Sequence, residues 1–184
     1  MQGSTAATRF RALGFIPLGF FLLNLFHHIQ ESKPDHILWI CNLDNLMIAL
    51  GLLLNAPVLI RIAILWLVPG FPLWLIESYE LGALPLSAVC AHVGALIFGF
   101  ALLPKIRMKR VTWIYATLYA LIVQQLSRWF TRSELNINVA FRPYSGWDQT
   151  FPHYWMFWLY IFGLTIAFLF LSSVLLSKLF PVHD

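Results

Sequence analysis

The chain has 184 residues, of which 60% are hydrophobic and only 11% are charged, and its formal net charge is +4. A soluble domain has about 25% charged residues, so this composition predicts an integral membrane protein without a separate soluble domain. The basic residues are few and scattered between apolar runs, which argues against nucleic acid as a partner. Two cysteines without a CxxC spacing exclude a zinc ribbon and a thioredoxin-like motif.

Six apolar runs are long enough for membrane helices, which need about 20 mostly apolar residues. In chain order they cover residues 10–29, 37–55, 58–76, 84–103, 111–130 and 153–177. The first run follows a short basic start, as in a signal peptide, but it continues without a small-residue cleavage site. We therefore expect an all-α bundle of six transmembrane helices, with residues 1–184 forming a single domain and the first span uncleaved.

Lysines and arginines are unevenly divided between the two sets of connections. Eight of the twelve flank the same side of the runs: Arg9, Arg11, Arg61, Lys105, Arg107, Lys109, Arg110 and Lys178. Because basic flanks favour the cytoplasmic side, we expect both termini and the cluster KIRMKR in the cytoplasm. The connections 30–36, 77–83 and 131–152 are then external, and the expected location is a plasma or inner membrane.

The polar side chains gather toward the expected external face. Six of the eight acidic residues lie in or beside those connections, and five of the six histidines lie in the outer half: His27, His28, His36, His92 and His153. Asp44 lies deeper, about 10–12 Å below the outer end of its run. A charged side chain at the bilayer centre costs roughly 2.5–3.5 kcal/mol, so Asp44 needs a polar partner. His92 and Arg128 are the leading candidates.

The stretch CNLDN supports a chemical interpretation of this region. Cys41, Asp44 and Asn45 fall at i, i+3 and i+4, on one helix face, and His92 lies at a similar depth in its own run. A thiol nucleophile needs a nearby base and a group that orients the base. Cys41, His92 and Asp44 have the residue types for these three roles. The alternatives are a structural hydrogen-bond network, a cysteine that only fills space, and a disulfide between Cys41 and Cys90.

The long outer connection after residue 130 predicts an ordered lid at the membrane interface, because it is rich in aromatic residues. Arginines beside it are suited to a lipid phosphate. The expected substrate-binding residues are Asn45, Arg128, Asn138, Arg142 and His153.

A metal site is an alternative that uses His27, His28 and Glu31, since His27 and Glu31 are spaced at i and i+4. No HExxH pattern accompanies these residues, so the first interpretation contains no metal. A haem held between His92 and either His27 or His28 is a further alternative, and no particular cofactor is predicted.

Several short motifs follow one another between residues 36 and 175. They are ILWICNL, AHVGAL, LYALIV, NINVAFRP and FPHYWMFWLY. In order and spacing they resemble the YwaF-type integral membrane family, whose animal relatives include ether-phospholipid acyltransferases. The resemblance implies that Cys41 carries an acyl group with His92 beside it. The chain departs from the family's pattern at Trp39, where the family has histidine, and in its Asn-Tyr motif, of which only Asn136 and Asn138 remain.

The leading expectation is therefore an enzyme that acts on lipid at the outer leaflet, by acyl transfer or hydrolysis through Cys41. A non-catalytic membrane subunit, or a carrier of lipid or small molecules, is the first alternative. A metal-dependent membrane hydrolase is the second. Membrane lipid is the expected partner, and the sequence predicts no oligomeric state or partner subunit.

Overall fold

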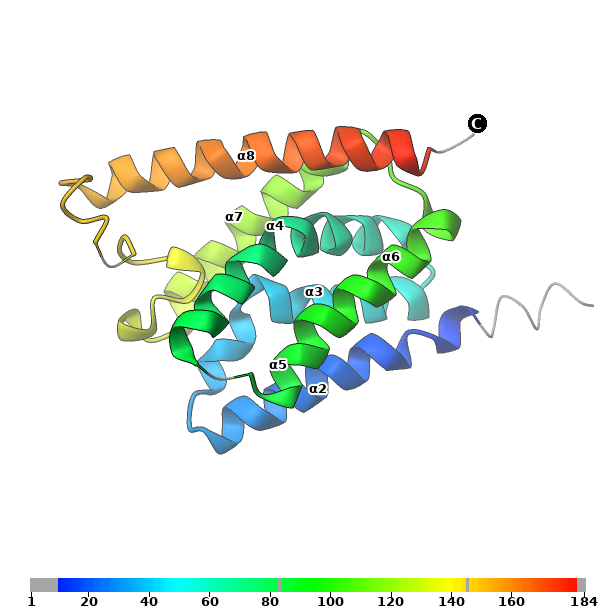
Figure 1. The fold of residues 1–184 in the computed structure, drawn as a ribbon, viewed down its shortest axis with the longest axis horizontal. Coiled ribbons are helices and arrows are strands. Elements are labelled where there is room, and N and C mark those ends of the chain that lie inside the picture. Colours follow the sequence, from blue (N-terminus) through cyan, green and yellow to red (C-terminus); the bar gives the residue numbers. More distant parts are fainter. Residues whose placement is uncertain (1–9, 83, 145, 182–184) are drawn as a thin grey trace, which may run out of the picture.

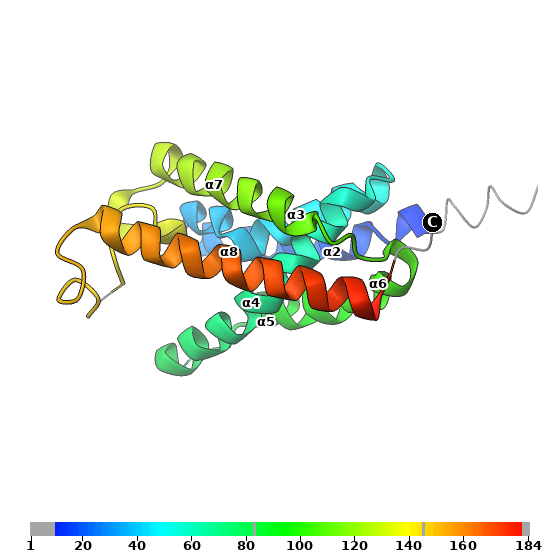
Figure 2. The same cartoon turned by 90° about the horizontal axis from the view of Figure 1, so that it is seen from above.

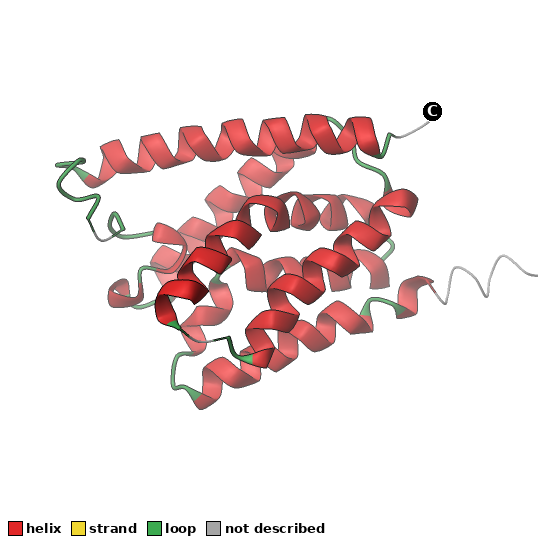
Figure 3. Cartoon of the chain, viewed as in Figure 1, coloured by secondary structure: helices red, strands yellow, loops and turns green. Residues whose placement is uncertain are grey.

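The computed structural model describes residues 10–82, 84–144 and 146–181, and this part of the chain is helical and without β-strands (Figures 1 and 3). The α-helices are α2 (Phe15–Gln30), α3 (Ile40–Leu53), α4 (Pro57–Leu81), α5 (Leu86–Val89), α6 (Ala95–Ile106), α7 (Thr112–Phe130) and α8 (Tyr154–Leu179). The shorter turns are η1 (Pro34–Leu38), η2 (Cys90–Gly94), η3 (Ser133–Leu135) and η4 (Ile137–Val139). The expected all-α fold class is confirmed.

Among the described residues, four helices are long and apolar enough to cross a membrane: Phe10–Gln30, Pro57–Tyr79, Leu86–Ile106 and Tyr154–Leu179. The third of these runs through α5, the π-helical turn η2 and α6. The other two expected spans are shorter or more polar. Helix α3 has 14 residues, fewer than the roughly 20 that a bilayer requires, and α7 carries two glutamines and an arginine within its 19 residues. The membrane character is thus supported, and the six-span topology stays a prediction.

The helices run up and down, so that connections alternate between two ends of the bundle (Figure 1). The beginning of the described chain, the connection 107–111 and the end of α8 lie together at one end, which we name the terminal end. The turn η1 and the loop 131–153 lie at the opposite end, which we name the distal end. Viewed from above, α8 crosses the bundle between α7 and the distal half of α4 (Figure 2).

Helix α4 is the centre of the packing, because it contacts α3, α6, α7 and α8. Its first half supplies much of the apolar core, including Ile64 and Leu65, which are fully buried. It approaches α3 closely at Gly51, where an added Cβ would lie 2.5 Å from Cγ1 of Ile60. Pro69 and Pro72 lie inside the helix, which bends along its length (Figure 1), as expected where proline removes a backbone hydrogen bond.

At the terminal end, two arginine side chains donate hydrogen bonds to the carbonyl groups at helix C-termini. Arg61 donates to the carbonyl oxygens of Ile106 and Arg107 at 2.8 and 2.7 Å, beyond the last turn of α6. Arg11 donates to the carbonyl of Leu53 at 2.8 Å, at the end of α3. The last carbonyls of a helix lack intrahelical partners, and basic side chains can supply them. Part of the basic excess on this side therefore has a structural function.

Candidate functional site

The first turns of α3 contain Cys41, Asp44 and Asn45, which were predicted from the sequence to be part of the site. Cys41 is half-buried with a free thiol, whereas Asp44 and Asn45 are only 1% and 0% exposed. Helix α3 begins at Ile40, whose backbone N–H donates to Oδ1 of Asn138 at 3.0 Å. The α3 turn with Cys41 is therefore positioned from the distal loop, nearly a hundred residues later in the chain.

Asp44 lies beside the hydroxyl of Tyr119, which reaches it from α7. Both carboxyl oxygens and the Tyr119 hydroxyl are buried, and none of them makes a hydrogen bond of regular geometry with the described residues. The partners expected from the sequence were His92 and Arg128. Neither forms a hydrogen bond or ion pair with Asp44 within the described chain, and Tyr119 is the polar side chain that lies beside it instead.

Asn45 connects the two segments that carry the cysteines. Its Nδ2 donates to the carbonyl of Cys41 at 3.1 Å, in its own helix, and to the carbonyl of Ala91 at 2.9 Å, in η2. The Asn45 amide therefore holds the Cys41 turn of α3 next to η2. Asn45 was expected to bind substrate, but its fully buried side chain acts between two helices.

His92 lies in η2 and is 6% exposed. Its ring stacks on Trp74 of α4, with centroids 4.4 Å apart and an interplanar angle of 6°. Its Nδ1 lies 2.9 Å from the carbonyl oxygen of Ala88. Because a carbonyl oxygen only accepts, Nδ1 carries the proton and Nε2 is the unprotonated nitrogen of the neutral ring. Among the described residues, no hydrogen bond joins Cys41, His92 and Asp44, and the Ala88 carbonyl takes the orienting role that the sequence assigned to Asp44.

Two asparagines that the sequence interpretation did not assign to the site join α2 to α3. Nδ2 of Asn24 donates to Oδ1 of Asn42 at 2.6 Å, and Nδ2 of Asn42 donates to the carbonyl of His36 at 2.8 Å. Both side chains are buried. The spacing of Asn24, His27 and His28 places the three on one face of a helix. That spacing does not indicate that Asn42 is the partner of Asn24. The network corresponds to the structural alternative for the polar groups of this region.

Asn138 was expected to bind substrate, and the structure gives it three internal bonds instead. Besides accepting from Ile40, it donates from Nδ2 to the carbonyl of Leu38 at 2.7 Å and to Oγ of Ser127 at 2.8 Å. Its backbone has a φ of 52°, a left-handed conformation that asparagine tolerates. Asn138 therefore fastens the distal loop to the start of α3 and to α7.

The remaining expected binding residues do not converge on Cys41. Arg128 donates from Nε to the carbonyl of Ala140 at 2.6 Å, and its guanidinium lies 5.2 Å from the ring centre of Tyr154. Arg142 is exposed on the distal loop and donates to the carbonyl of Glu134 at 2.9 Å. His153 is exposed where α8 begins and stacks near Trp155. These residues order or line the loop at the distal end.

The alternative metal ligands lie near one another without forming a metal-binding group. Nε2 of His27 is 3.7 Å from Oε1 of Glu31, and the ring of His28 lies 5.3 Å from that of His36. In the described part of the chain, no group of three or more His, Cys, Asp or Glu side chains is arranged to hold a metal ion. Burial lowers the pKa of His36, which favours the neutral form of this ring.

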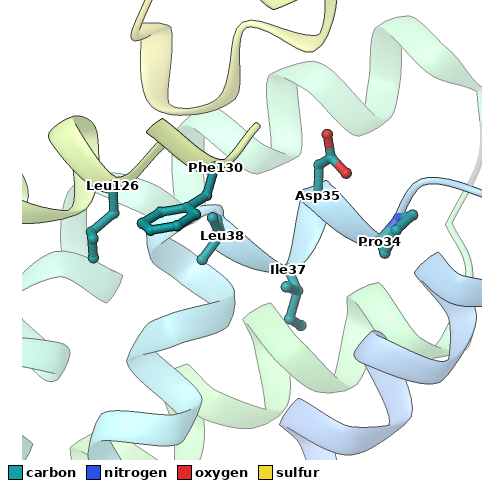
Figure 4. A pocket seen from close by; sticks show the side chains of 6 residues that line it. All are labelled: Pro34, Asp35, Ile37, Leu38, Leu126 and Phe130. Atoms are coloured by element: carbon teal, nitrogen blue, oxygen red, sulfur yellow. The ribbon is translucent and has the colours of Figure 1, made fainter. Parts of the chain in front are cut away.

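An apolar cavity of about 490 Å³ lies between η1 and the end of α7 (Figure 4). It is lined by Pro34, Asp35, Ile37, Leu38, Leu126 and Phe130. At its rim, Oδ2 of Asp35 accepts from the backbone N–H and from Nε of Arg132, at 3.0 and 3.1 Å. The backbone N–H is the larger cause that lowers the pKa of Asp35 below its ordinary value of 3.8. This ion pair ties η1 to the end of α7.

Comparisons with known proteins identify no relative: no protein-family model matches the chain, and neither a curated protein nor a solved structure matches it.

Proposed function

We propose that the chain crosses the membrane six times, with the terminal end in the cytoplasm and the distal end outside. The excess of lysine and arginine at the terminal end supports this orientation. In the described part of the chain, four helices have the length and hydropathy of membrane spans. The shorter α3 is extended by η1 toward the distal end, and Ser127 and Arg128 of α7 are hydrogen-bonded to the distal loop.

Cysteine accessibility tests this orientation. In a variant without native cysteines, Lys109→Cys is expected to resist a membrane-impermeant thiol reagent in intact cells, whereas Gln149→Cys is expected to react. Both positions are exposed, at opposite ends of the bundle, so the pair controls for thiol access. Modification of Lys109→Cys from outside, with protection of Gln149→Cys, would reverse the orientation.

We further propose that the protein transfers or hydrolyses an acyl group of a membrane lipid, with Cys41 as the nucleophile and His92 as the base. The observation that carries this proposal is the Asn45 side chain, which bonds the Cys41 carbonyl and the Ala91 carbonyl next to His92. The tautomer of His92 supports it, since Nε2 is the nitrogen able to accept a proton. The segment is π-helical, a local irregularity that is frequent at functional sites.

The proposed reaction needs only Cys41, His92 and a lipid ester. Nε2 of His92 takes the thiol proton, Sγ of Cys41 attacks the ester carbonyl carbon, and a thioester forms as the bond to the lipid oxygen breaks. The departing oxygen takes the proton from His92. The acyl group then passes from sulfur to a lipid hydroxyl or to water, whose proton is taken by Nε2 of His92 and passed to the departing Sγ to restore the thiol.

Labelling of purified protein with an acyl-donor probe tests the nucleophile. We expect Cys41→Ser to abolish labelling and Cys90→Ser to leave it largely intact, because Cys41 lies on the turn that Asn45 holds against η2. Cys90 is the comparison, since both cysteines are free. Equal labelling of the two single variants would show that the cysteines only pack.

A non-catalytic carrier or subunit is the second candidate. The observation that favours it is Asp44, whose carboxyl faces Tyr119 rather than an imidazole, so that no hydrogen-bonded Cys–His–Asp series exists among the described residues. If folded wild-type protein is not labelled by the acyl-donor probe, the carrier or subunit function explains the protein better than the acyl enzyme does.

A further inference from the structure

A second cavity, of about 420 Å³, lies in the distal loop. It is lined by Asn136, Arg142, Pro143, Tyr144 and Asp148. Its size falls in the range of small-ligand sites. One cationic and one anionic side chain border it, and both are exposed.

The loop that forms this cavity is held in shape by bonds within the loop. Oδ1 of Asn136 accepts from the backbone N–H groups of Phe141 and Arg142, at 3.0 and 3.1 Å, and its Nδ2 donates to the Arg142 carbonyl at 3.0 Å. The Tyr154 hydroxyl donates to the neighbouring carbonyls of Val139 and Ala140. A site held in this way loses little freedom when a ligand binds.

The two charged residues have unused binding capacity. Arg142 has five N–H donors, and the bond given to its guanidinium is the one to the Glu134 carbonyl. Within the described chain, neither Arg142 nor Asp148 forms an ion pair. A guanidinium matches the geometry of phosphate, and a carboxylate beside an aromatic ring attracts an ammonium. Arg142 and Asp148 carry one positive and one negative charge. They would therefore complement a ligand that has one phosphodiester and one ammonium group.

The aromatic residues around the cavity lead us to expect it at the depth of a lipid headgroup. Beside it, Tyr144 and Trp147 pack on Phe157 near the start of α8, with ring centroids 6.3 and 6.0 Å apart. Trp147 also lies 6.0 Å from Tyr160. Tryptophan and tyrosine prefer the membrane–water interface, so this aromatic cluster marks that interface at the distal end.

We propose that this cavity binds the headgroup of a zwitterionic phospholipid, with the phosphate on Arg142 and the ammonium between Asp148 and Tyr144. The inference deepens the proposed lipid-acting function and rests on it for the fate of the bound lipid. Binding itself does not require the Cys41 chemistry.

The test measures binding of diether phospholipids, which have no ester to react, to the purified full chain in detergent. A fluorophore on one alkyl chain of the phosphatidylethanolamine probe reports binding. We expect Arg142→Gln to raise the dissociation constant about tenfold, since it removes a charge-assisted hydrogen-bond donor. Asp148→Asn should raise it about two- to fivefold, as expected for an exposed ion pair. For diether phosphatidylglycerol, which lacks the ammonium, Asp148→Asn should not weaken binding.

Two controls match these changes in charge. Lys33→Gln and Glu31→Gln alter exposed residues of the distal end that do not line the cavity, and both should bind like the wild type. Cys41→Ser should also bind normally, which separates this test from the test of the nucleophile. Unchanged affinity of Arg142→Gln would overturn the headgroup site even if Cys41 is labelled. Free phosphoethanolamine binding as tightly as the diether lipid would overturn the assignment to a lipid.

Discussion

Replacing His92 by phenylalanine is expected to slow acylation of Cys41 by about 10²–10⁴-fold, the usual loss when a general base is removed. Phenylalanine keeps an aromatic ring that can stack on Trp74, where the imidazole centroid lies 4.4 Å away. It removes both nitrogens, including the Nε2 that the Ala88 bond leaves unprotonated. The measurement is the initial rate of labelling by an acyl-donor probe, compared across variants at equal folded fraction.

His92→Ala distinguishes base loss from packing loss. This variant should be as slow as His92→Phe, and added imidazole should restore part of its rate, because the cavity left by the ring admits a free base. His92→Phe should melt close to the wild-type temperature, whereas His92→Ala should melt lower since a buried ring is lost. A wild-type labelling rate in His92→Phe would remove His92 from the mechanism.

Replacing Asn138 by alanine is expected to lower the free energy of unfolding by about 2–4 kcal/mol. The change leaves the backbone N–H of Ile40 and the carbonyl of Leu38 without their side-chain partner. It also places a Cβ-bearing residue less tolerant than asparagine at a φ of 52°. Denaturation in detergent, followed by the tryptophan signal, measures the loss.

Asn138→Gly separates these two causes, because glycine adopts a positive φ freely but makes none of the side-chain bonds. It should be destabilised less than Asn138→Ala, by roughly 1 kcal/mol. Gln149→Ala, at an exposed position of the same loop, should change stability little. Wild-type stability in both Asn138 variants would mean that the distal loop does not fasten the start of α3.

The helices themselves follow from the sequence with little ambiguity. Each apolar run is mostly helical, and proline or glycine stands near several of the helix ends, as at Pro57 and Gly82 of α4. Because the helices run up and down, the described chain begins and α8 ends at the same end of the bundle (Figure 1). These features depend on local composition and on chain length, which a single sequence states directly.

The partner of each polar side chain was much less predictable. Helical spacing correctly grouped Cys41, Asp44 and Asn45 near one another, but it assigned Asp44 to His92 or Arg128 rather than to Tyr119. The motif LYALIV contains Tyr119, yet nothing in its spacing indicated that its hydroxyl reaches α3. Asn138 was likewise assigned to a ligand, although its partners are Ile40, Leu38 and Ser127.

The sequence by itself determined an apolar, helical chain whose polar residues gather toward one end, because the periodicity of 3.6 residues fixes which side chains share a helix face. Only the tertiary structure decided which faces meet. The order of helices around α4 depends on side-chain packing along the whole chain. That packing turns Asp44 toward Tyr119 and Asn45 toward Ala91. It also brings the side chain of Asn138 to the first turn of α3. No local pattern encodes those neighbours, since each pairs residues many turns apart in the chain.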